Sequence, residues 1–354
     1  MNFKALLSWS KEEFTDLPWR RSRSLYRTLV SEIMLQQTTV GTVRNHYERF
    51  LRRFPDLEAL ANASEEELLV AWKGLGYYRR ARSLKKIAES IFRDHGGKFP
   101  KAAAQLEAIP GIGPYTASAL ISIGMDRRAV AVDANIERVI ARLYGLQLPK
   151  GPKLQKEIYS RFEAGEILSH DFSYRDLNEA LMDLGRTFCQ ARRAVCELCP
   201  MRKDCSAFRS GTPLAYPAEG KVKVAKVDKG HELNLLRIYV MKDEKILVYK
   251  KETHEWLSGQ YEVPTFILSS TDAKLAQYPL LDTPEELDPA HTYKTGITKY
   301  NIVNSVLVMD EKKLKKFKYP RDLEWRHISS EASNFSTATL KGLSIISGKK
   351  YQIT

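Results

Sequence analysis

IPGIGPYTA, at residues 109–117, places two glycines between segments whose apolar residues recur at helical spacing. Such a turn leaves backbone N–H groups pointing outward at the start of a helix, where they can bind a phosphate oxygen. Gly111, Ile112 and Gly113 are therefore candidate phosphate contacts. The same pattern also joins many ordinary helices, so the residues on either side of it decide its meaning.

Two carboxylates lie on either side of this turn in the chain. Asp133 follows the apolar run 129–132 and precedes an expected helix, which predicts an N-cap. Capping is compatible with catalysis, because the helix dipole would keep this carboxylate ionised. Glu32 lies among apolar residues at helical spacing, where burial would raise its pKa and suit it to protonating a leaving group. An exposed helical charge is the alternative interpretation of Glu32.

All four cysteines of the chain, Cys189, Cys196, Cys199 and Cys205, fall within one short segment. Their spacing, Cys-x6-Cys-x2-Cys-x5-Cys, indicates a metal site rather than disulfides. Zinc and a [4Fe-4S] cluster both accept four thiolates, but structural zinc sites usually pair two short knuckles, so this single continuous wrap favours the cluster. The basic residues around the cysteines suit phosphate contacts, with a solvated charged surface as the alternative.

The composition is that of a soluble globular protein of about two domains. The chain has 354 residues, of which 43% are hydrophobic and 28% charged, and its formal net charge is +13. A polyanionic partner such as nucleic acid would explain this charge. The sequence has no run of about 18 apolar residues that could span a membrane and no features of a signal peptide, which predicts a cytoplasmic protein.

The pattern along the chain predicts two domains with a connector between them. Residues 65–72, 81–94 and 115–123 have helical spacing, whereas 235–241, 245–249 and 302–309 read as strands. We therefore expect a mainly α domain over residues 1–209, with a metal-binding loop at 189–205. A basic connector over 210–232 and a smaller α+β domain over 233–354 follow.

The turn, the aspartate and the cysteine wrap, in this order, resemble the helix-hairpin-helix, Gly-Pro-Asp superfamily of DNA glycosylases. Finer motifs resemble its adenine-specific, MutY-type branch. These motifs are LPWR at 17–20, SEIMLQQT at 31–38, GLGYY at 74–78, VDAN at 132–135 and NEALMDLG at 178–185. The resemblance is close over residues 1–209 and loose beyond. It implies the helix-hairpin-helix glycosylase fold, a monomer, and a bacterial, nucleoid-associated enzyme acting on double-stranded DNA that contains A·8-oxoguanine or A·G mispairs.

The resemblance also implies a reaction, the hydrolysis of the N-glycosidic bond of an adenine flipped out of the duplex during base-excision repair. Glu32 would protonate the leaving base at N7, and Asp133 would stabilise the oxocarbenium-like sugar, either electrostatically or as a transient covalent nucleophile. Tyr115 and Asn135 would support that charge. Related bifunctional lyases carry a Schiff-base lysine where this chain has Tyr115, so a monofunctional glycosylase without lyase activity is expected.

Other positions are carried over from the same motifs. Trp19, Arg20 and Glu179 would line the adenine pocket. Gln36, Gln37 and Tyr77 would wedge into the duplex and fill the vacated space, with core packing as the alternative for Tyr77.

The C-terminal part resembles the Nudix-like module that inspects the base opposite adenine. No Nudix box is present, so pyrophosphatase activity is not expected. Where the family usually has Phe-Ser-His, this chain has Ile297-Thr298-Lys299, in which Thr298 keeps a hydroxyl and Lys299 keeps a donor. A shifted alignment places residues 293–295 there instead, and a plain strand and turn without base contact is the alternative. Selectivity for 8-oxoguanine over guanine is therefore left open.

Two other functions compete with adenine excision. One is a related glycosylase that removes thymine from G·T mismatches, against which Glu32 and the Gln36-Gln37 wedge argue. The other is a non-catalytic iron–sulfur protein that binds damaged DNA, which is disfavoured because binding alone needs neither carboxylate.

Overall fold

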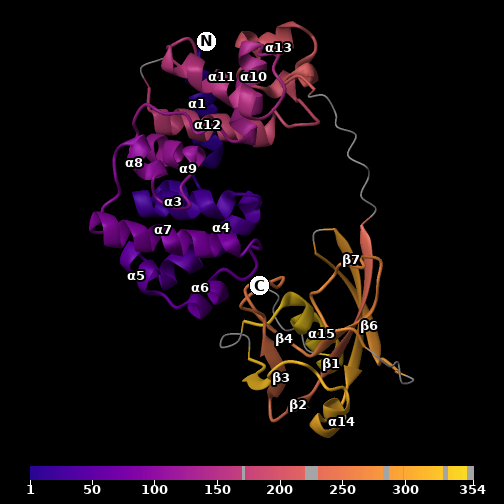
Figure 1. Cartoon of the computed structure of the whole chain (residues 1–354). Coiled ribbons are helices and arrows are strands. Elements are labelled where there is room, and N and C mark those ends of the chain that lie inside the picture. The colour runs from indigo at the N-terminus through magenta and orange to yellow at the C-terminus, as the bar shows by residue number, and fades with distance from the viewer. Residues whose placement is uncertain (170–171, 220–229, 282–286, 298, 330–333, 349–354) are drawn as a thin grey trace. The chain divides into compact units, whose positions relative to one another are not determined.

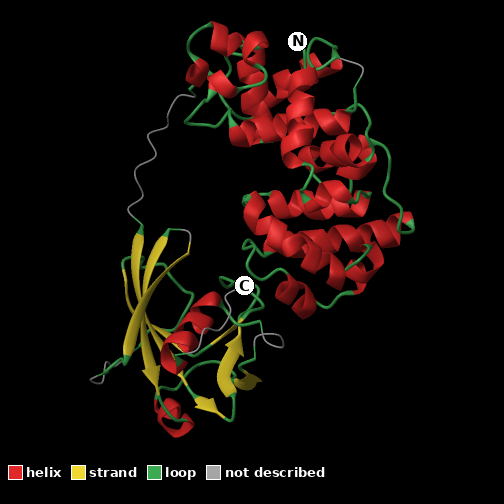
Figure 2. Cartoon of the chain, turned by 180° about the vertical axis from the view of Figure 1, so that it is seen from behind, coloured by secondary structure: helices red, strands yellow, loops and turns green. Residues whose placement is uncertain are grey.

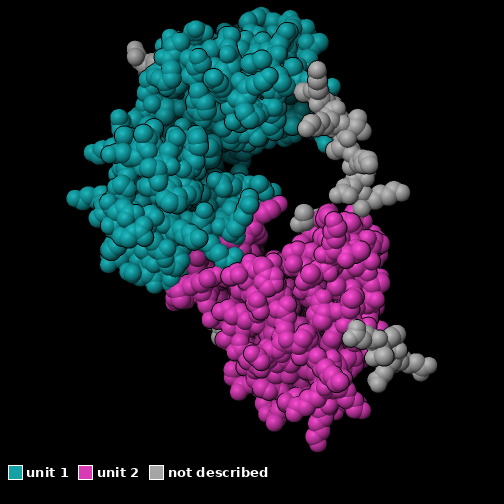
Figure 3. Space-filling view, in the orientation of Figure 1, with its two compact units in different colours: residues 1–63, 79–224 teal, residues 64–78, 225–354 magenta. Residues whose placement is uncertain are grey.

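The computed structural model describes residues 1–169, 172–219, 230–281, 287–297, 299–329 and 334–348. The chain forms two compact units, one of residues 1–63 and 79–224 and one of residues 64–78 and 225–354 (Figure 3). Residues 64–78 group with the second unit, which the sequence pattern does not predict. Residues 220–229 of the expected connector lie outside the described residues. No helix in the described ranges is both long and apolar enough to span a bilayer.

The first unit is built from helices (Figures 1 and 2). Its α-helices are α1 (Lys4–Phe14), α2 (Pro18–Arg21), α3 (Leu25–Leu35), α4 (Val40–Arg53), α5 (Leu57–Asn62), α7 (Arg79–His95), α8 (Ala103–Glu107), α9 (Pro114–Ala119), α10 (Ala134–Tyr144), α11 (Pro152–Glu163), α12 (Tyr174–Thr187) and α13 (Ser206–Arg209). A π-helix, η1 (Leu120–Gly124), continues α9, and short 3-10 turns follow at η2 (Cys196–Leu198), η3 (Arg202–Asp204) and η4 (Pro213–Ala215). Helix α6 (Glu65–Ala71) belongs to the second unit. The helices predicted over 65–72, 81–94 and 115–123 are confirmed.

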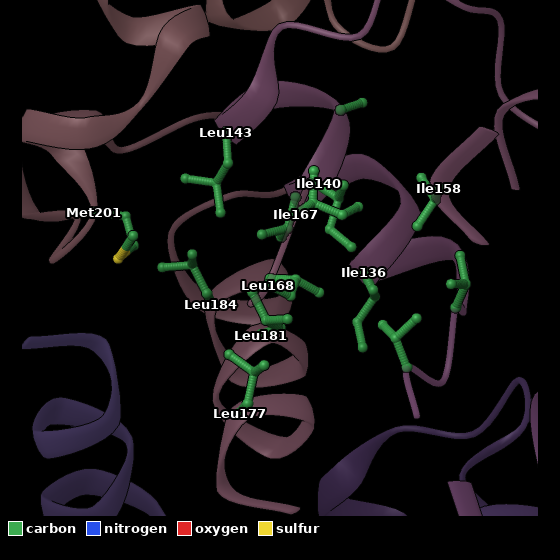
Figure 4. Packing of buried hydrophobic residues seen from close by; sticks show 14 of the residues in the cluster. Ile136, Ile140, Leu143, Ile158, Ile167, Leu168, Leu177, Leu181, Leu184 and Met201 are labelled. Atoms are coloured by element: carbon green, nitrogen blue, oxygen red, sulfur yellow. The ribbon is translucent and has the colours of Figure 1, made fainter. Parts of the chain in front are cut away.

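Helices α10 and α12 pack against each other through their apolar faces (Figure 4). Helix α10 buries Ile136 and Ile140, four residues apart, and α12 buries Leu177, Leu181 and Leu184 at spacings of four and three. This spacing aligns the apolar side chains along one stripe of each helix.

The two helices also approach closely at Gly185, where an added Cβ would lie 2.7 Å from the Cβ of Asn135. Only glycine permits this approach, which fixes the first turn of α10 beside α12.

The second unit combines sheets and helices, as predicted. Its strands are β1 (His231–Tyr239), β2 (Met241–Lys242), β3 (Lys245–Lys250), β4 (Tyr261–Glu262), β5 (Thr265–Ser270), β6 (His291–Ile297), β7 (Tyr300–Val308) and β8 (Glu324–His327), and its later helices are α14 (Glu311–Lys316) and α15 (Thr337–Ser347). One sheet has the order β5-β1-β7-β6, with β1 and β7 parallel and the outer pairs antiparallel. The other joins β2, β3 and β4, with β8 also paired to β3. The strands predicted over 235–241, 245–249 and 302–309 are confirmed within one or two residues at most ends.

A buried charge cluster lies in this unit. The carboxylate of Glu262 binds Lys251 Nζ at 2.5 Å and Arg237 Nη1 at 2.6 Å, and all three side chains are buried. Burial alone would raise the pKa of Glu262, but the two cations lower it to about 2. The cluster is therefore charged at neutral pH, and its mutual attraction offsets the desolvation cost of burying three charges.

Candidate active site

Glu32 lies on α3, a helix whose two ends are both capped. Ser24 accepts a hydrogen bond from the backbone N–H of Arg27 at the N-terminus. At the C-terminus, the buried guanidinium of Arg80 donates to the carbonyl oxygens of Ile33 at 3.0 Å and Met34 at 2.8 Å, and also to that of Gln36. These carbonyls have no partner within the helix, so Arg80 supplies the cap. Sequence analysis missed Arg80.

Asp133 is the N-cap of α10, as predicted. Its Oδ1 accepts hydrogen bonds from the backbone N–H groups of Asn135 at 2.9 Å and Ile136 at 2.7 Å, and its Oδ2 accepts one from the side-chain amide of Asn135 at 2.9 Å. Arg138 then donates to Asn135 Oδ1 at 2.9 Å and to the carbonyl oxygen of Cys189 at 2.7 Å. The carboxylate is thus held by three donors, and its amide neighbour is tied to the start of the cysteine loop.

Glu32 and Tyr115 form a buried pair. The Tyr115 hydroxyl donates to Glu32 Oε2, and Glu32 is only 5% exposed. Burial raises the pKa of Glu32 to about 7; Tyr115 works against this rise, and the charge of Asp133 adds to it. Glu32 is therefore about half protonated at neutral pH, which suits a general acid.

Two opposing effects act on the pKa of Asp133. Burial raises the pKa of Asp133 above its ordinary value, although its three hydrogen bonds lower it. The favourable contacts at the start of α10 therefore offset only part of the desolvation cost.

A pocket of 1120 Å³ lies between α2, α3, η1 and the first turns of α9 and α10, with α12 along one side. It brings together nine of the residues that the sequence singled out: Trp19, Arg20, Glu32, Gln36, Gln37, Tyr115, Asp133, Asn135 and Glu179. These positions come from segments far apart in the chain, so their convergence is a property of the fold. A concave site with paired carboxylates of perturbed pKa is the pattern of an active site.

Charged side chains cross one wall of this pocket. Glu179 accepts hydrogen bonds from Arg23 at 2.6 and 3.0 Å, and its Oε2 lies 3.3 Å from Arg20 Nε. Arg20 also binds Asp183 at 2.9 Å, and Ser10 donates to the same carboxylate at 2.6 Å. Sequence analysis found Arg20 and Glu179 but missed the other three.

The turn at 109–113 differs in detail from expectation. Gly111 has φ +102°, and an added Cβ would meet Ser83 Oγ at 3.0 Å, so glycine is required there. Ile112 is buried, and its backbone N–H donates to the carbonyl oxygen of Ile109 at 3.0 Å. Gly113 is exposed and caps α9. Of the three candidate phosphate contacts, Ile112 is thus already engaged within the turn.

Of the three wedge candidates, Gln37 and Tyr77 lie in strained, exposed backbone, whereas Gln36 has φ −59° and is half-buried. Gln37 has φ +57° and is exposed, and Tyr77, in the second unit, has φ +46° and is 59% exposed. Left-handed backbone costs energy for residues other than glycine, so the fold holds both side chains outward against strain. Core packing does not describe Tyr77. In the second unit Lys299 is exposed at the tip between β6 and β7, whereas Thr298 lies outside the described residues.

The four cysteines are free thiols that line one cavity next to α10 and α12. Arg142 donates to Cys189 Sγ at 3.3 Å. Burial raises the pKa of Cys199 to about 12, and it raises those of Cys196 and Cys205 as well. Such thiols would become thiolates only if a bound cationic group compensated the charge.

Within the described ranges, no three His, Cys, Asp or Glu residues are arranged to hold a single metal ion. A four-iron cluster spreads its thiolate ligands over separate iron atoms, so four cysteines around a shared cavity fit a cluster better than one zinc ion.

Comparisons with known proteins agree with this geometry. A family model described as "HhH-GPD superfamily base excision DNA repair protein" matches residues 30–164. The adenine DNA glycosylase of Mycobacterium tuberculosis (strain CDC 1551 / Oshkosh) is 38% identical over 218 residues, which cover 61% of this chain and 69% of that protein. The chain belongs to the HhH-GPD superfamily, in its MutY-type branch.

Further relatives define how far the likeness extends. The adenine DNA glycosylase of Buchnera aphidicola subsp. Schizaphis graminum (strain Sg) is 33% identical to this chain over 210 residues. These residues cover 59% of this chain and 60% of the relative. The chain thus spans about 60% of that relative's length. A solved structure of a thermostable thymine-DNA glycosylase matches with a TM-score of 0.51 and 30% identity, covering 58% of this chain and 94% of that one. The HhH-GPD glycosylase fold is therefore confirmed for the matched part.

Proposed function

We propose that this chain is a monofunctional DNA glycosylase of base-excision repair that hydrolyses the N-glycosidic bond of adenine mispaired with 8-oxoguanine or guanine. The observation that carries the proposal is the convergence of Glu32, Tyr115 and Asp133 on one pocket, with the pKa of Glu32 raised to about 7. An acid that is partly protonated at neutral pH, facing an aspartate held by three donors, is the arrangement that N-glycoside hydrolysis needs. The adenine DNA glycosylases to which the chain is similar support adenine as the leaving base.

The two carboxylates would divide the reaction between them. Because Tyr115 donates to Glu32 Oε2, the proton of neutral Glu32 resides on Oε1, from which it passes to N7 of the flipped adenine. Protonation makes the base a better leaving group. As the bond to the sugar breaks, the negative charge of Asp133 stabilises the oxocarbenium-like sugar. Glu32, now ionised, can accept a proton from the attacking water.

The absence of lyase activity is supported by the residues around the pocket. In the described part of the chain, no lysine lines it, and Tyr115 offers a hydroxyl where the related lyases have an amine. Without an amine, no Schiff base with the sugar can form. The product would be an abasic site with an unbroken strand.

Cys189, Cys196, Cys199 and Cys205 would hold a [4Fe-4S] cluster. When bound, the cluster would crosslink the loop 189–205 and hold its basic side chains for phosphate contacts, so it stabilises structure without taking part in hydrolysis. Iron and sulfide near four per chain, with an absorption band near 400 nm, would support this assignment. Zinc in their place would overturn it and leave the glycosylase proposal unchanged.

The second unit would inspect the base opposite adenine. Its strand and helix content supports an α+β module of the Nudix-like kind, and the tip between β6 and β7 is the segment that would approach that base. Its exposed Lys299 offers a donor. The ratio of the rates of adenine release opposite 8-oxoguanine and opposite guanine measures how strongly this tip favours 8-oxoguanine.

A single-turnover assay tests the proposal. Duplexes would carry adenine opposite 8-oxoguanine, guanine, cytosine or thymine, and a further duplex a G·T mismatch. Products would be analysed with and without hot alkali. Strand breaks at adenine only after alkali are expected, fastest opposite 8-oxoguanine. The Glu32→Gln protein should bind the mismatch and release almost no adenine.

Two outcomes would replace the proposal. Release of thymine alone would favour the G·T glycosylase, an alternative that the similarity to a solved thymine-DNA glycosylase keeps in view. Release of no base from any duplex would favour a DNA-binding protein without catalysis.

A further inference from the structure

Arg23 precedes α3 and holds the carboxylate of Glu179 on α12. Its Nη1 donates to Oε1 at 2.6 Å and its Nη2 to Oε2 at 3.0 Å, so both carboxylate oxygens are engaged by one planar guanidinium. This bidentate geometry fixes the plane of the carboxylate as well as its position. Arg20 adds a second cation, 3.3 Å from Oε2.

The two partners differ in their access to the pocket. Glu179 lines it, whereas Arg23 is not among the lining residues in the described ranges. The side chain of Glu179 is 10% exposed and that of Arg23 is 28% exposed. Arg23 therefore lies outside the lining of the pocket, and any effect it has on a base bound there is transmitted through Glu179.

We propose that Arg23 is a positioning residue that fixes Glu179 as a hydrogen-bond acceptor in the base pocket, and that this selects purines with a 6-amino group. The inference rests on the proposed function. A planar guanidinium that donates to both oxygens of a carboxylate fixes the directions in which those oxygens accept further hydrogen bonds.

The group at position 6 of the purine ring decides which bases the Glu179 acceptor favours. The amino group of adenine donates to such an acceptor, and the oxo group of hypoxanthine is repelled by it. Unsubstituted purine leaves the acceptor without a partner. A site built around a fixed polar group rejects analogues that lack the complementary group. Without Arg23, the Glu179 side chain would be free to rotate away from this position, and the same pocket would distinguish these bases less well.

The test compares a change in the protein with a change in the base. Wild type, Arg23→Ala, Arg23→Lys and a control, Arg21→Ala, are assayed in single turnover on adenine, purine and hypoxanthine, each opposite guanine. Arg21 is a matched control because it lies on α2 close by and, among the residues that the structure describes, pairs only with the exposed Asp16. Circular dichroism and thermal unfolding check that each variant is folded. Intrinsic differences in the lability of the N-glycosidic bond cancel when the rate of each variant on a given base is divided by the wild-type rate on the same base.

We expect Arg23→Ala to slow adenine release about 10- to 100-fold, the effect of losing a hydrogen bond to a charged group, and to slow purine release much less. Arg23→Lys keeps the charge without the planar fork and should fall in between. Arg21→Ala should leave the adenine-to-purine ratio unchanged. Because a purely structural role would slow both bases equally, the ratio reports positioning.

Equal slowing of adenine and purine in folded variants, or no change in either, overturns the proposal. If Arg23→Ala does not fold, Arg23→Lys provides the same comparison. Failure of the wild-type protein to release adenine overturns the proposed function itself. The wild-type assay alone gives that result, so the two failures are distinguishable.

Discussion

Replacing Tyr115 by phenylalanine should raise the pKa of the catalytic acid. The hydroxyl donates to Glu32 Oε2 in a buried site, and this hydrogen bond favours the ionised carboxylate. A hydrogen bond to a charged group contributes about 1.5–3 kcal/mol, and one pKa unit corresponds to about 1.4 kcal/mol. Because the pKa of Glu32 is about 7 with Tyr115 present, its loss should move this pKa upward by about one to two units.

The pH dependence of kcat/KM gives the measurement. The proposed reaction needs protonated Glu32 and ionised Asp133, so the profile should be bell-shaped, with activity falling as pH rises through the pKa of Glu32. In Tyr115→Phe this alkaline limb should shift toward higher pH. The maximal rate should fall because Glu32 loses the hydrogen bond from the Tyr115 hydroxyl.

Tyr26→Phe is a matched control for this shift. Tyr26 lies on the same helix as Glu32, but its hydroxyl donates to the carbonyl oxygen of Phe54, away from the pocket. An alkaline limb in Tyr115→Phe that stays in place, or that moves to lower pH, would refute the assignment of Glu32 as the acid.

Three further substitutions probe the same structure. Glu32→Gln should stabilise the protein relative to wild type by an amount that grows by about 3 kcal/mol from about pH 4.5 to about pH 8. The reason is that the raised pKa of Glu32 makes wild type lose stability as pH rises through about 7. Denaturant unfolding at both pH values measures this difference in the free energy of unfolding, and a difference that does not change with pH would contradict the prediction. Glu262→Gln should destabilise the second unit by about 3–5 kcal/mol, because it leaves buried cations without their partner. In wild type, the stability that this carboxylate contributes should disappear as pH falls from about 4.5 to about 2. An unchanged unfolding midpoint for the variant would count against the first prediction. Gly185→Ala should cost about 1–3 kcal/mol and slow catalysis by displacing Asn135, whereas Gly41→Ala, in open space on a helix, should be neutral or stabilising; thermal unfolding and single-turnover rates of the two proteins separate these effects.

The sequence was sufficient to predict nine of the residues that line the pocket. Glu32 and Asp133 were identified because each breaks an apolar run with a charge, and Asp133 also lies where a helix must begin. The helices and strands followed from residue spacing, which depends on local geometry alone. The nine residues that share the pocket were found because each belongs to a short motif.

The residues that hold these groups in place were missed for a physical reason. Arg80 caps α3 from a different helix, and Arg23 binds a carboxylate 156 positions away in the chain. No local pattern distinguishes such an arginine from the many exposed basic residues of a chain with net charge +13. The close approach of Gly185 to Asn135 is equally invisible, because it depends on how two helices cross.

The pocket also explains why its two acids can take opposite roles. Burial raises the pKa of both Glu32 and Asp133, so the hydrogen bonds that each carboxylate accepts distinguish the two groups. Asp133 accepts three hydrogen bonds, two of them from backbone N–H groups at the start of α10, and each stabilises its ionised form. Glu32 accepts one from Tyr115 and is more deeply buried. The hydrogen bonds therefore favour the ionised form more strongly at Asp133 than at Glu32, which is the division that the proposed departure of a protonated base from a cationic sugar requires.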